Sequence, residues 1–283
     1  MLHKVITSLF IILLSACSHN RTPEKNPDQK KADIYYMYGT DSLLKQKYTE
    51  ALDHLLKAYN LEPNNHLVLN NLGMAYYFKK DTAKALKYIN RSLELNPQNS
   101  DARNNLASIY FHKSKFNEAK EQYQKILTHL TYKHQYRVHY NLGLISLKQN
   151  KWQNAESEFK LSVAEKDDYC PANYQLGKIK NRLNDSKRAR DYFLKAMSGT
   201  CIKYPAPQFE LANISLRKGR YKKARAQYLE IIERFPDTTY MVRAQSKLVQ
   251  LKELINNVDL SKRGKYKNGK MKRLSPSGDG SFD

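Results

Sequence analysis

A recurring pattern of small and large apolar residues organises most of the chain. Six times in succession a small residue is followed, twelve positions later, by an alanine, and successive pairs begin 34 to 36 residues apart. The pairs are Gly39/Ala51, Gly73/Ala85, Ala107/Ala119, Gly143/Ala155, Gly177/Ala189 and Ala212/Ala224. A period near 34 residues is typical of stacked helical hairpins, each of which buries its apolar face only against its neighbours. We interpret the constant spacing of twelve as the register in which two small side chains let the two helices of a hairpin approach closely.

Large apolar residues recur with the same period. One stands four places after each alanine, as Leu55, Ile89, Tyr123, Phe159, Phe193 and Tyr228. The pattern resembles the tetratricopeptide (TPR) repeat and covers residues 32–237. The resemblance implies an all-α fold, a right-handed α-solenoid of about six TPR hairpins. Apolar residues at helical spacing after the sixth repeat predict a capping helix at residues 238–258, which shields the open end of the stack.

The first 17 residues form a different kind of segment. A short basic start is followed by the apolar run from Val5 to Leu14, which is too short to span a bilayer and is typical of a secretory signal. Cys17 directly after Leu-Ser-Ala resembles the bacterial lipobox. This resemblance implies removal of residues 1–16 and lipid attachment (a palmitate or similar acyl group) at Cys17. The alternative is an ordinary signal peptide cut near Ala16. Ser18 in place of a retaining aspartate implies an outer-membrane lipoprotein facing the periplasm.

Two polar segments flank the repeats. Residues 17–31 hold the acylated cysteine and, because they are polar and lack periodicity, are predicted to be a flexible tether. Residues 259–283 are predicted to be a disordered basic tail, since residues 261–273 hold seven Lys or Arg and no acidic residue.

The chain is strongly basic, with 49 Lys and Arg against 27 Asp and Glu. Such a surplus favours an anionic partner. Export excludes nucleic acid and leaves anionic lipid, acidic wall polymer or acidic envelope proteins. The excess gathers in repeats five and six, so we expect an anionic lipid or wall polymer to contact the basic C-terminal half. The alternative is a solvated face of lysine-rich helices.

Two cysteines remain after Cys17. Cys170 precedes the first helix of repeat five and Cys201 follows its second helix, so the antiparallel hairpin brings them side by side. In the oxidising periplasm we expect a disulfide between them. Two separate thiols are the alternative if the Cα atoms lie more than about 7 Å apart.

The sequence contains no catalytic motif. Its eight histidines are scattered, and neither a glycine-rich phosphate loop nor a Gly-x-Ser-x-Gly turn occurs. We therefore predict a protein that is not an enzyme and that needs no metal or cofactor.

Stacked hairpins present an extended surface suited to binding protein clients. In TPR domains the first helix of each hairpin lines this surface, and here its fifth and twelfth positions are rich in aromatic and amide side chains. We predict a peptide-binding groove lined by Tyr36, Asn70, Tyr77, Asn104, Phe111, Tyr140, Tyr174 and Phe209. The alternative is that several of these aromatics pack between adjacent repeats.

The combination of lipobox and repeats resembles the pilotin lipoproteins of type IV pilus systems, of the PilF, PilW and Tgl types. The stretches that carry this resemblance are residues 132–143 (YKHQYRVHYNLG), 170–177 (CPANYQLG) and 201–212 (CIKYPAPQFELA). It implies binding of secretin subunits and promotion of their assembly or localisation in the outer membrane for pilus biogenesis. The alternatives are a TPR lipoprotein adaptor that recruits cell-wall (peptidoglycan) enzymes, and an envelope enzyme with an unrecognised site.

Overall fold

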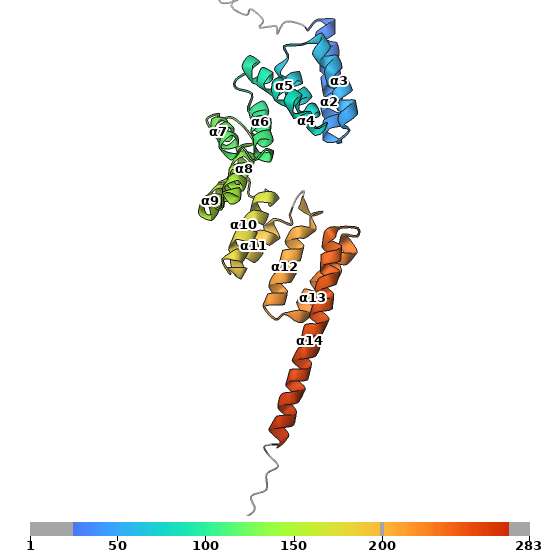
Figure 1. The fold of residues 1–283 in the computed structure, drawn as a ribbon, viewed down its shortest axis with the longest axis vertical. Helices are drawn as coiled ribbons and strands as arrows, with labels where there is room; N and C mark the ends of the chain where they lie inside the picture. Colours follow the sequence, from blue (N-terminus) through green and yellow to red (C-terminus); the bar gives the residue numbers. More distant parts are fainter. Residues whose placement is uncertain (1–24, 199–200, 272–283) are drawn as a thin grey trace, which may run out of the picture. The chain divides into compact units, whose positions relative to one another are not determined.

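The described part of the chain is helical and contains no strand. The computed structural model describes residues 25–198 and 201–271, with side chains through Ile255. The helices are α2 (Pro27–Leu44), α3 (Tyr48–Leu61), α4 (His66–Phe78), α5 (Thr82–Leu95), α6 (Ser100–His112), α7 (Phe116–Leu127), α8 (Gln135–Lys148), α9 (Trp152–Glu165), α10 (Cys170–Arg182), α11 (Ser186–Lys195), α12 (Pro205–Arg217), α13 (Tyr221–Arg234) and α14 (Thr239–Met271) (Figure 1).

The helices form two compact units. The described residues up to 122 belong to unit 1 and those from 123 onward to unit 2, and the division falls within α7. In unit 1, α2 pairs with α3 and α4 pairs with α5. In unit 2, the pairs are α8 with α9, α10 with α11, and α12 with α13, and α14 packs on the last pair. The predicted all-α stack of TPR hairpins is confirmed.

The small residues that define the period face large ones. All six alanines of the pairs are completely buried. The glycines, however, do not simply pair with these alanines. A Cβ atom on Gly177 would lie 2.5 Å from Cε1 of Phe193, and one on Gly73 would lie 2.6 Å from Cγ1 of Ile89. Each glycine thus makes room for the large residue four positions beyond the alanine, and the interpretation of the spacing is corrected in this respect.

The turn inside each hairpin has the same backbone conformation. One residue in each of the six turns has a positive φ between 58° and 69°, and these residues recur at the repeat period: Gln46, Lys80, Ser114, Asn150, Asn184 and Gly219. Glycine occupies only the last of these positions. The left-handed region is unfavourable for residues that carry a Cβ, so five of the turns hold a small amount of strain.

The two ends of the repeat array differ from their predicted boundaries. Helix α2 begins at Pro27, where a tether was expected through residue 31, because the Asn26 side chain accepts from the Gln29 amide at 2.8 Å and completes a capping box. Helix α14 continues to Met271, where a disordered tail was expected from 259. Lysine is a good helix former, and the first proline after the repeats is Pro276. The prediction was wrong at both boundaries.

The signal segment and Cys17 lie outside the described residues. Among the described helices, none has the length and apolarity that a membrane span requires.

Candidate peptide-binding site

The predicted groove residues of unit 1 lie beside a chain of hydrogen-bonded side chains. Asn71 Nδ2 donates to Thr40 Oγ1 at 2.8 Å, and Asn70 Nδ2 donates to Asn71 Oδ1 at 3.1 Å. Asn105 Nδ2 in turn donates to Asn70 Oδ1 at 2.9 Å. We call these four residues the amide ladder. It links α2, α4 and α6, the first helices of three consecutive hairpins, and holds them in one register.

The amide ladder changes the role of Asn70. Its side chain was predicted to line the groove, but the residue is only 6% exposed, and its amide donates to Asn71 and accepts from Asn105. Asn70 therefore aligns the helices and offers little surface to a client. Buried amides are used in this way because an unpaired polar group away from water is costly.

The other predicted residues of unit 1 are half-buried. Tyr36 packs on the cluster formed by α2, α3 and α4, and burial raises the pKa of its hydroxyl. The Tyr77 ring lies 6.3 Å from His112, and the Phe111 ring lies 5.7 Å from Phe116. Asn104 is also half-buried, and its Oδ1 atom accepts no hydrogen bond within the described chain. These four side chains therefore bury part of their area against neighbouring residues and expose the rest to solvent.

Unit 2 contains a pocket lined by aromatic and small side chains. Its volume is about 300 Å³. The lining residues are Tyr140, Cys170, Pro171, Tyr174, Ala196, Cys201, Tyr204, Ala206 and Pro207, which come from α8, α10, the end of α11 and the start of α12. Tyr140 and Tyr174 were predicted to line the groove, and the structure brings both to this one pocket. A pocket of this composition suits an apolar side chain with a few hydrogen bonds at its edge.

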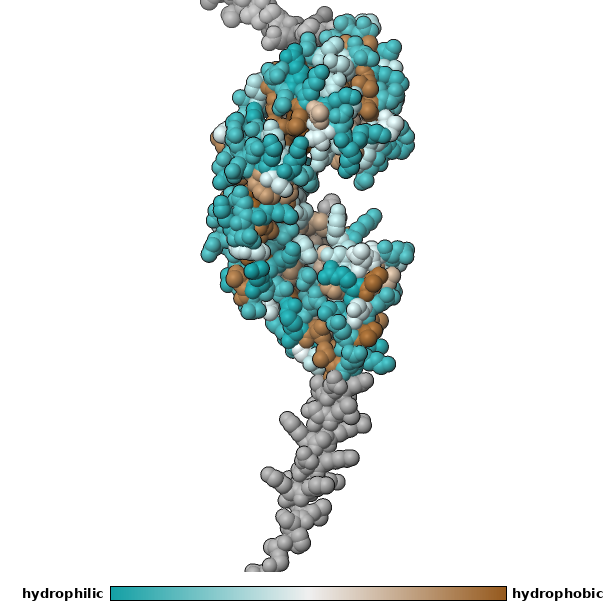
Figure 2. Space-filling model, in the orientation of Figure 1, coloured by the Kyte–Doolittle hydropathy of each residue, from teal (hydrophilic) through white to brown (hydrophobic). Residues whose placement is uncertain are grey.

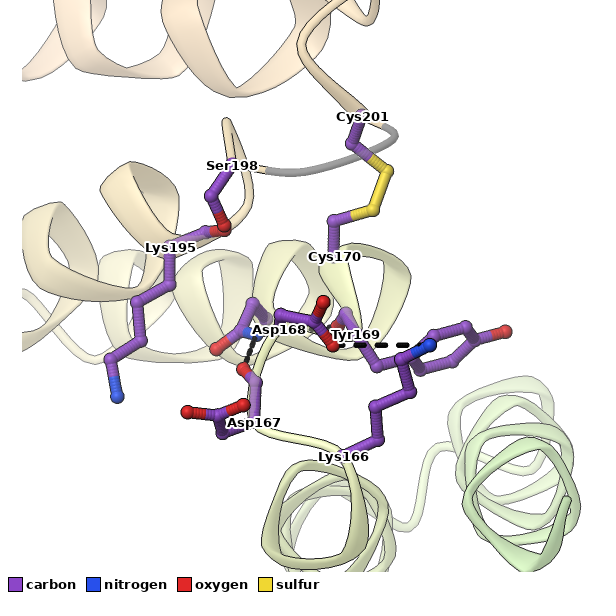
Figure 3. The surroundings of a disulfide bond; sticks show 9 residues. Lys166, Asp167, Asp168, Tyr169, Cys170, Lys195, Ser198 and Cys201 are labelled. Atoms are coloured by element: carbon purple, nitrogen blue, oxygen red, sulfur yellow. Dashed lines mark hydrogen bonds and ion pairs between the residues drawn. A yellow bond between two sulfur atoms is a disulfide. The ribbon is translucent and has the colours of Figure 1, made fainter. Parts of the chain in front are cut away.

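A disulfide forms part of the pocket wall. Cys170 opens α10 and Cys201 precedes α12, and their sulfur atoms are bonded with the Cα atoms 6.2 Å apart (Figure 3). The bond closes a loop that contains all of α10 and α11. In the chain-entropy account such a loop stabilises the fold by about 3–4 kcal/mol. The cross-link fixes the first turn of α10 and the approach to α12, so it also fixes two sides of the pocket.

Burial favours the neutral form of three tyrosines at and near the pocket, Tyr140, Tyr169 and Tyr174. Burial is the main cause that raises the pKa of Tyr140 and Tyr174 above that of a free tyrosine. Next to Tyr140, with ring centroids 5.5 Å apart, burial raises the pKa of Tyr169 to about 12. The hydroxyl groups therefore donate and accept hydrogen bonds and do not act as bases.

Phe209 does not line the groove, in contrast to the prediction. It is 1% exposed and belongs to the core of α12, α13 and α14. Its ring lies 5.6 Å from Tyr240, and the Arg243 guanidinium stands 4.4 Å from the ring centroid. Helix α14 thus packs over Phe209 as the next hairpin would, because a capping helix must cover the same apolar surface that a further repeat would bury.

Five of the lining residues were missed in the sequence. Tyr204 is the most useful of them, because it is 63% exposed at the pocket. Pro171 and Pro207 lie in the first turns of α10 and α12, where proline is compatible with a helix start. The signal was the clustering of proline and tyrosine next to both cysteines.

The described residues provide no obvious catalytic or metal centre. Across residues 25–198 and 201–271, no three His, Cys, Asp or Glu side chains are grouped so as to hold a metal ion. The His139 ring lies between two carboxylates. Its Nδ1 atom is 2.8 Å from Glu158 Oε2, and its Nε2 atom is 3.7 Å from Glu165 Oε1. No nucleophile is recorded beside it.

Comparison with protein families identifies the repeats. Models described as tetratricopeptide repeat match residues 66–99 and 88–121 in unit 1, and residues 171–198 and 208–238 in unit 2. Together with the helical hairpins, these matches show that the chain contains tetratricopeptide repeats in both units.

Among solved structures, two of the similar ones come from type IV pilus studies. PilF of Pseudomonas aeruginosa aligns with a TM-score of 0.67 at 17% identity, over 78% of this chain and 100% of that chain. PilW, described as a widely conserved type IV pilus biogenesis factor, aligns with a TM-score of 0.64 at 21% identity, over 77% of this chain and 98% of that one.

The same fold occurs outside pilus systems. The Cut9–Hcn1 hetero-tetramer of the APC/C aligns with a TM-score of 0.65 at 15% identity, over 87% of this chain and 46% of that chain. No sequence of a characterised protein matches the chain. The similarities to these solved structures therefore establish the fold, that of a TPR solenoid.

Proposed function

We propose that the protein is an outer-membrane lipoprotein that binds secretin subunits through its TPR array and promotes their assembly or localisation for type IV pilus biogenesis. The acyl group on Cys17 anchors it to the membrane, with the repeats in the periplasm. No bond in the client is made or broken.

The proposal rests on one observation: this chain aligns with nearly the whole length of two pilus proteins. The chain covers all of the PilF structure and 98% of the PilW structure. The lipobox-like residues before the repeats support an anchored protein of the same kind. TPR arrays in other settings share the hairpins, so the lipobox and the matched extent together distinguish this proposal.

The pocket of unit 2 provides the gripping point for a client segment. An apolar or aromatic side chain of the client enters between Tyr140, Tyr174 and Tyr204, and the tyrosine hydroxyl groups hydrogen-bond the client backbone at the edge. The membrane anchor raises the local concentration of pocket and client in the same leaflet, which strengthens a modest intrinsic affinity.

A gene deletion tests the role. Without the protein, we expect secretin multimers to disappear from outer-membrane fractions while secretin monomers remain, and re-expression to restore the multimers. Cross-linking and purification of the lipidated protein should recover secretin subunits. Normal multimers and intact pili in the deletion strain would exclude the role. Recovery of cell-wall synthases or hydrolases in place of secretin would support the adaptor alternative.

A matched pair of variants tests the pocket. Tyr204→Ala removes an exposed aromatic from the pocket, and we expect a 10- to 30-fold loss of client affinity, the range of a hot-spot aromatic. Tyr38→Ala removes a tyrosine of similar exposure (50% against 63%) from α2 in unit 1, and we expect less than a twofold change. Equal effects of the two variants would contradict the assignment of the pocket.

A further inference from the structure

The second helices of hairpins five and six carry the same basic and apolar residues at equivalent positions. Relative to Ala189 in α11, Lys187, Arg190 and Leu194 stand at −2, +1 and +5. Relative to Ala224 in α13, Lys222, Arg225 and Leu229 stand at the same three positions. We call these six residues the basic face. Because the hairpins repeat along the stack, equivalent positions recur on one side of it.

The basic face is exposed and its charges are not neutralised. All four cations are exposed, and none of them forms an ion pair with another described residue. The two leucines are also exposed, Leu194 to 45% and Leu229 to 42%. The first hairpin has Thr49, Leu52 and Leu56 at these positions, so the repeat itself does not require cations there.

The first-turn cations are placed against the intrinsic preference of the helix. Lys187 and Lys222 are each the second residue of their helix, where the partial positive charge of the helix N-terminus repels a cation. Acidic residues occupy the first turns of α3 and α7, with Glu50 and Glu118. Lys187 and Lys222 therefore destabilise their own helices slightly, and an anionic partner bound to them would offset this destabilisation.

An apolar hollow continues the basic face onto α14. Its volume is about 470 Å³. Its lining is Arg225, Leu229, Leu248, Val249, Leu251, Lys252 and Ile255. Val249 is 62% exposed, and Figure 2 shows brown patches in this part of the surface, near the point where α14 turns grey. Cations therefore lie beside an apolar surface. The cations suit the phosphate of a phospholipid, and the apolar surface suits its acyl chains.

We propose that the basic face and this hollow lie against an anionic phospholipid surface. Lys and Arg side chains attract anionic headgroups, and Leu194, Leu229 and Val249 enter the boundary between headgroups and acyl chains. An acidic wall polymer would use the cations but would leave the exposed leucines and valine without a role. The contact is separate from the pocket at Tyr204, so a client and a membrane are bound by different residues.

Vesicle binding by the mature chain, residues 17–283, tests this contact. Cys17→Ser is introduced in every sample, so that no acyl anchor contributes, and co-sedimentation is measured with vesicles of phosphatidylglycerol and phosphatidylcholine. The charge variant combines Lys187→Gln, Arg190→Gln, Lys222→Gln and Arg225→Gln. The control variant removes four cations from unit 1: Lys80→Gln, Lys87→Gln, Lys113→Gln and Lys120→Gln.

The two variants are expected to differ strongly. Each cation near an anionic surface contributes about a fivefold factor, so the charge variant should bind at least 50-fold more weakly. The control variant should change by less than about fivefold. Because both chains share residues 17–31 and 259–283, the difference reports the basic face alone. Binding to pure phosphatidylcholine should be weak for all chains, and added salt should weaken binding to anionic vesicles.

A third variant separates a phospholipid from a soluble polyanion. Leu194→Gln with Leu229→Gln keeps every charge, and we expect about tenfold weaker binding to anionic vesicles with unchanged binding to purified cell-wall sacculi. Circular dichroism checks that each variant is folded. The proposal is overturned if the charge variant binds anionic vesicles like the parent, if both charge-removing variants lose binding equally, or if the charge variant loses only sacculus binding.

Discussion

The two units are built from the same hairpin but present different surfaces. Unit 1 aligns its first helices with the buried amide ladder, and its described residues 25–122 hold 15 Lys or Arg against 11 Asp or Glu. Unit 2 has the tyrosine-lined pocket, and residues 178–225 hold 14 Lys or Arg against 3 Asp or Glu. The repeat therefore fixes the buried positions and leaves the exposed positions free to take separate tasks.

Cross-linking is the largest difference between the units. Cys170→Ser removes the disulfide of unit 2, and we expect a loss of about 3–4 kcal/mol because the unfolded chain is no longer restrained. Hydrogen exchange should show lower protection in α10 and α12, while α4 and α5 of unit 1 stay unchanged. Reduced parent protein is the control and should match the variant. Two titratable thiols in the oxidised parent would contradict the bond.

Alkaline pH should also separate the units. Burial raises the pKa of Tyr169 and Tyr228 in unit 2 to about 12, from the ordinary value of 10.0. The folded state favours the neutral hydroxyl, so this stabilisation is complete below pH 10 and is lost as the pH rises towards 12. We expect the urea concentration at which unit 2 unfolds, measured by hydrogen exchange, to fall steeply between about pH 10 and pH 12.

A single hydroxyl provides the check on this alkaline transition. Tyr228→Phe removes one ionising group and should flatten the decline, although the parent hydroxyl also donates to Asn213 Oδ1 at 2.8 Å. An unchanged slope above pH 10 would show that Tyr228 does not contribute.

The close glycine contacts predict an inverted effect of alanine. In a helix Gly→Ala normally stabilises by up to about 1 kcal/mol. Gly177→Ala should instead destabilise unit 2 by about 1–3 kcal/mol, since its Cβ would overlap the buried ring of Phe193. Thermal unfolding measures the change. Phe193→Leu in the same chain should recover part of the loss, and a stabilised Gly177→Ala variant would refute the contact.

The turns give the smallest expected effects, and they act in both units. Gly219→Ala should destabilise unit 2 by about 1 kcal/mol, because alanine is unfavourable at a φ of 68°. Lys80→Gly at the equivalent turn of unit 1 should stabilise by a few tenths of a kcal/mol, since relief of strain is partly offset by the greater freedom of glycine in the unfolded chain. Chemical denaturation should resolve the opposite signs.

The buried part of the fold could be predicted from the sequence. The six alanines are all completely buried, and Phe159, Phe193 and Tyr228 fill the core four positions later. This worked because a repeated structure reports each buried position six times. The ends could not be predicted equally well, since Pro27 as a helix start and the continuation of α14 to Met271 depend on local capping and propensity, which occur once.

The candidate site was predicted only in part. Tyr140 and Tyr174 lie in the pocket. The Asn70 side chain, however, is hydrogen-bonded within the amide ladder, and Phe209 is covered by α14. Periodicity identifies the helix face on which a residue lies. It does not reveal whether a neighbouring side chain or a capping helix covers that face. Tyr204 was missed because it lies before α12, outside the repeated positions.

The bond between Cys170 and Cys201 also determines how the protein carries mechanical load. In the proposed role the chain is held at the membrane by Cys17 and bound to a client, so that tension runs along its backbone. The covalent bridge transmits this force directly from residue 170 to residue 201, so α10 and α11 are bypassed and cannot be drawn out as an extended chain. The hairpin beside the pocket is therefore protected from extension by the covalent bond.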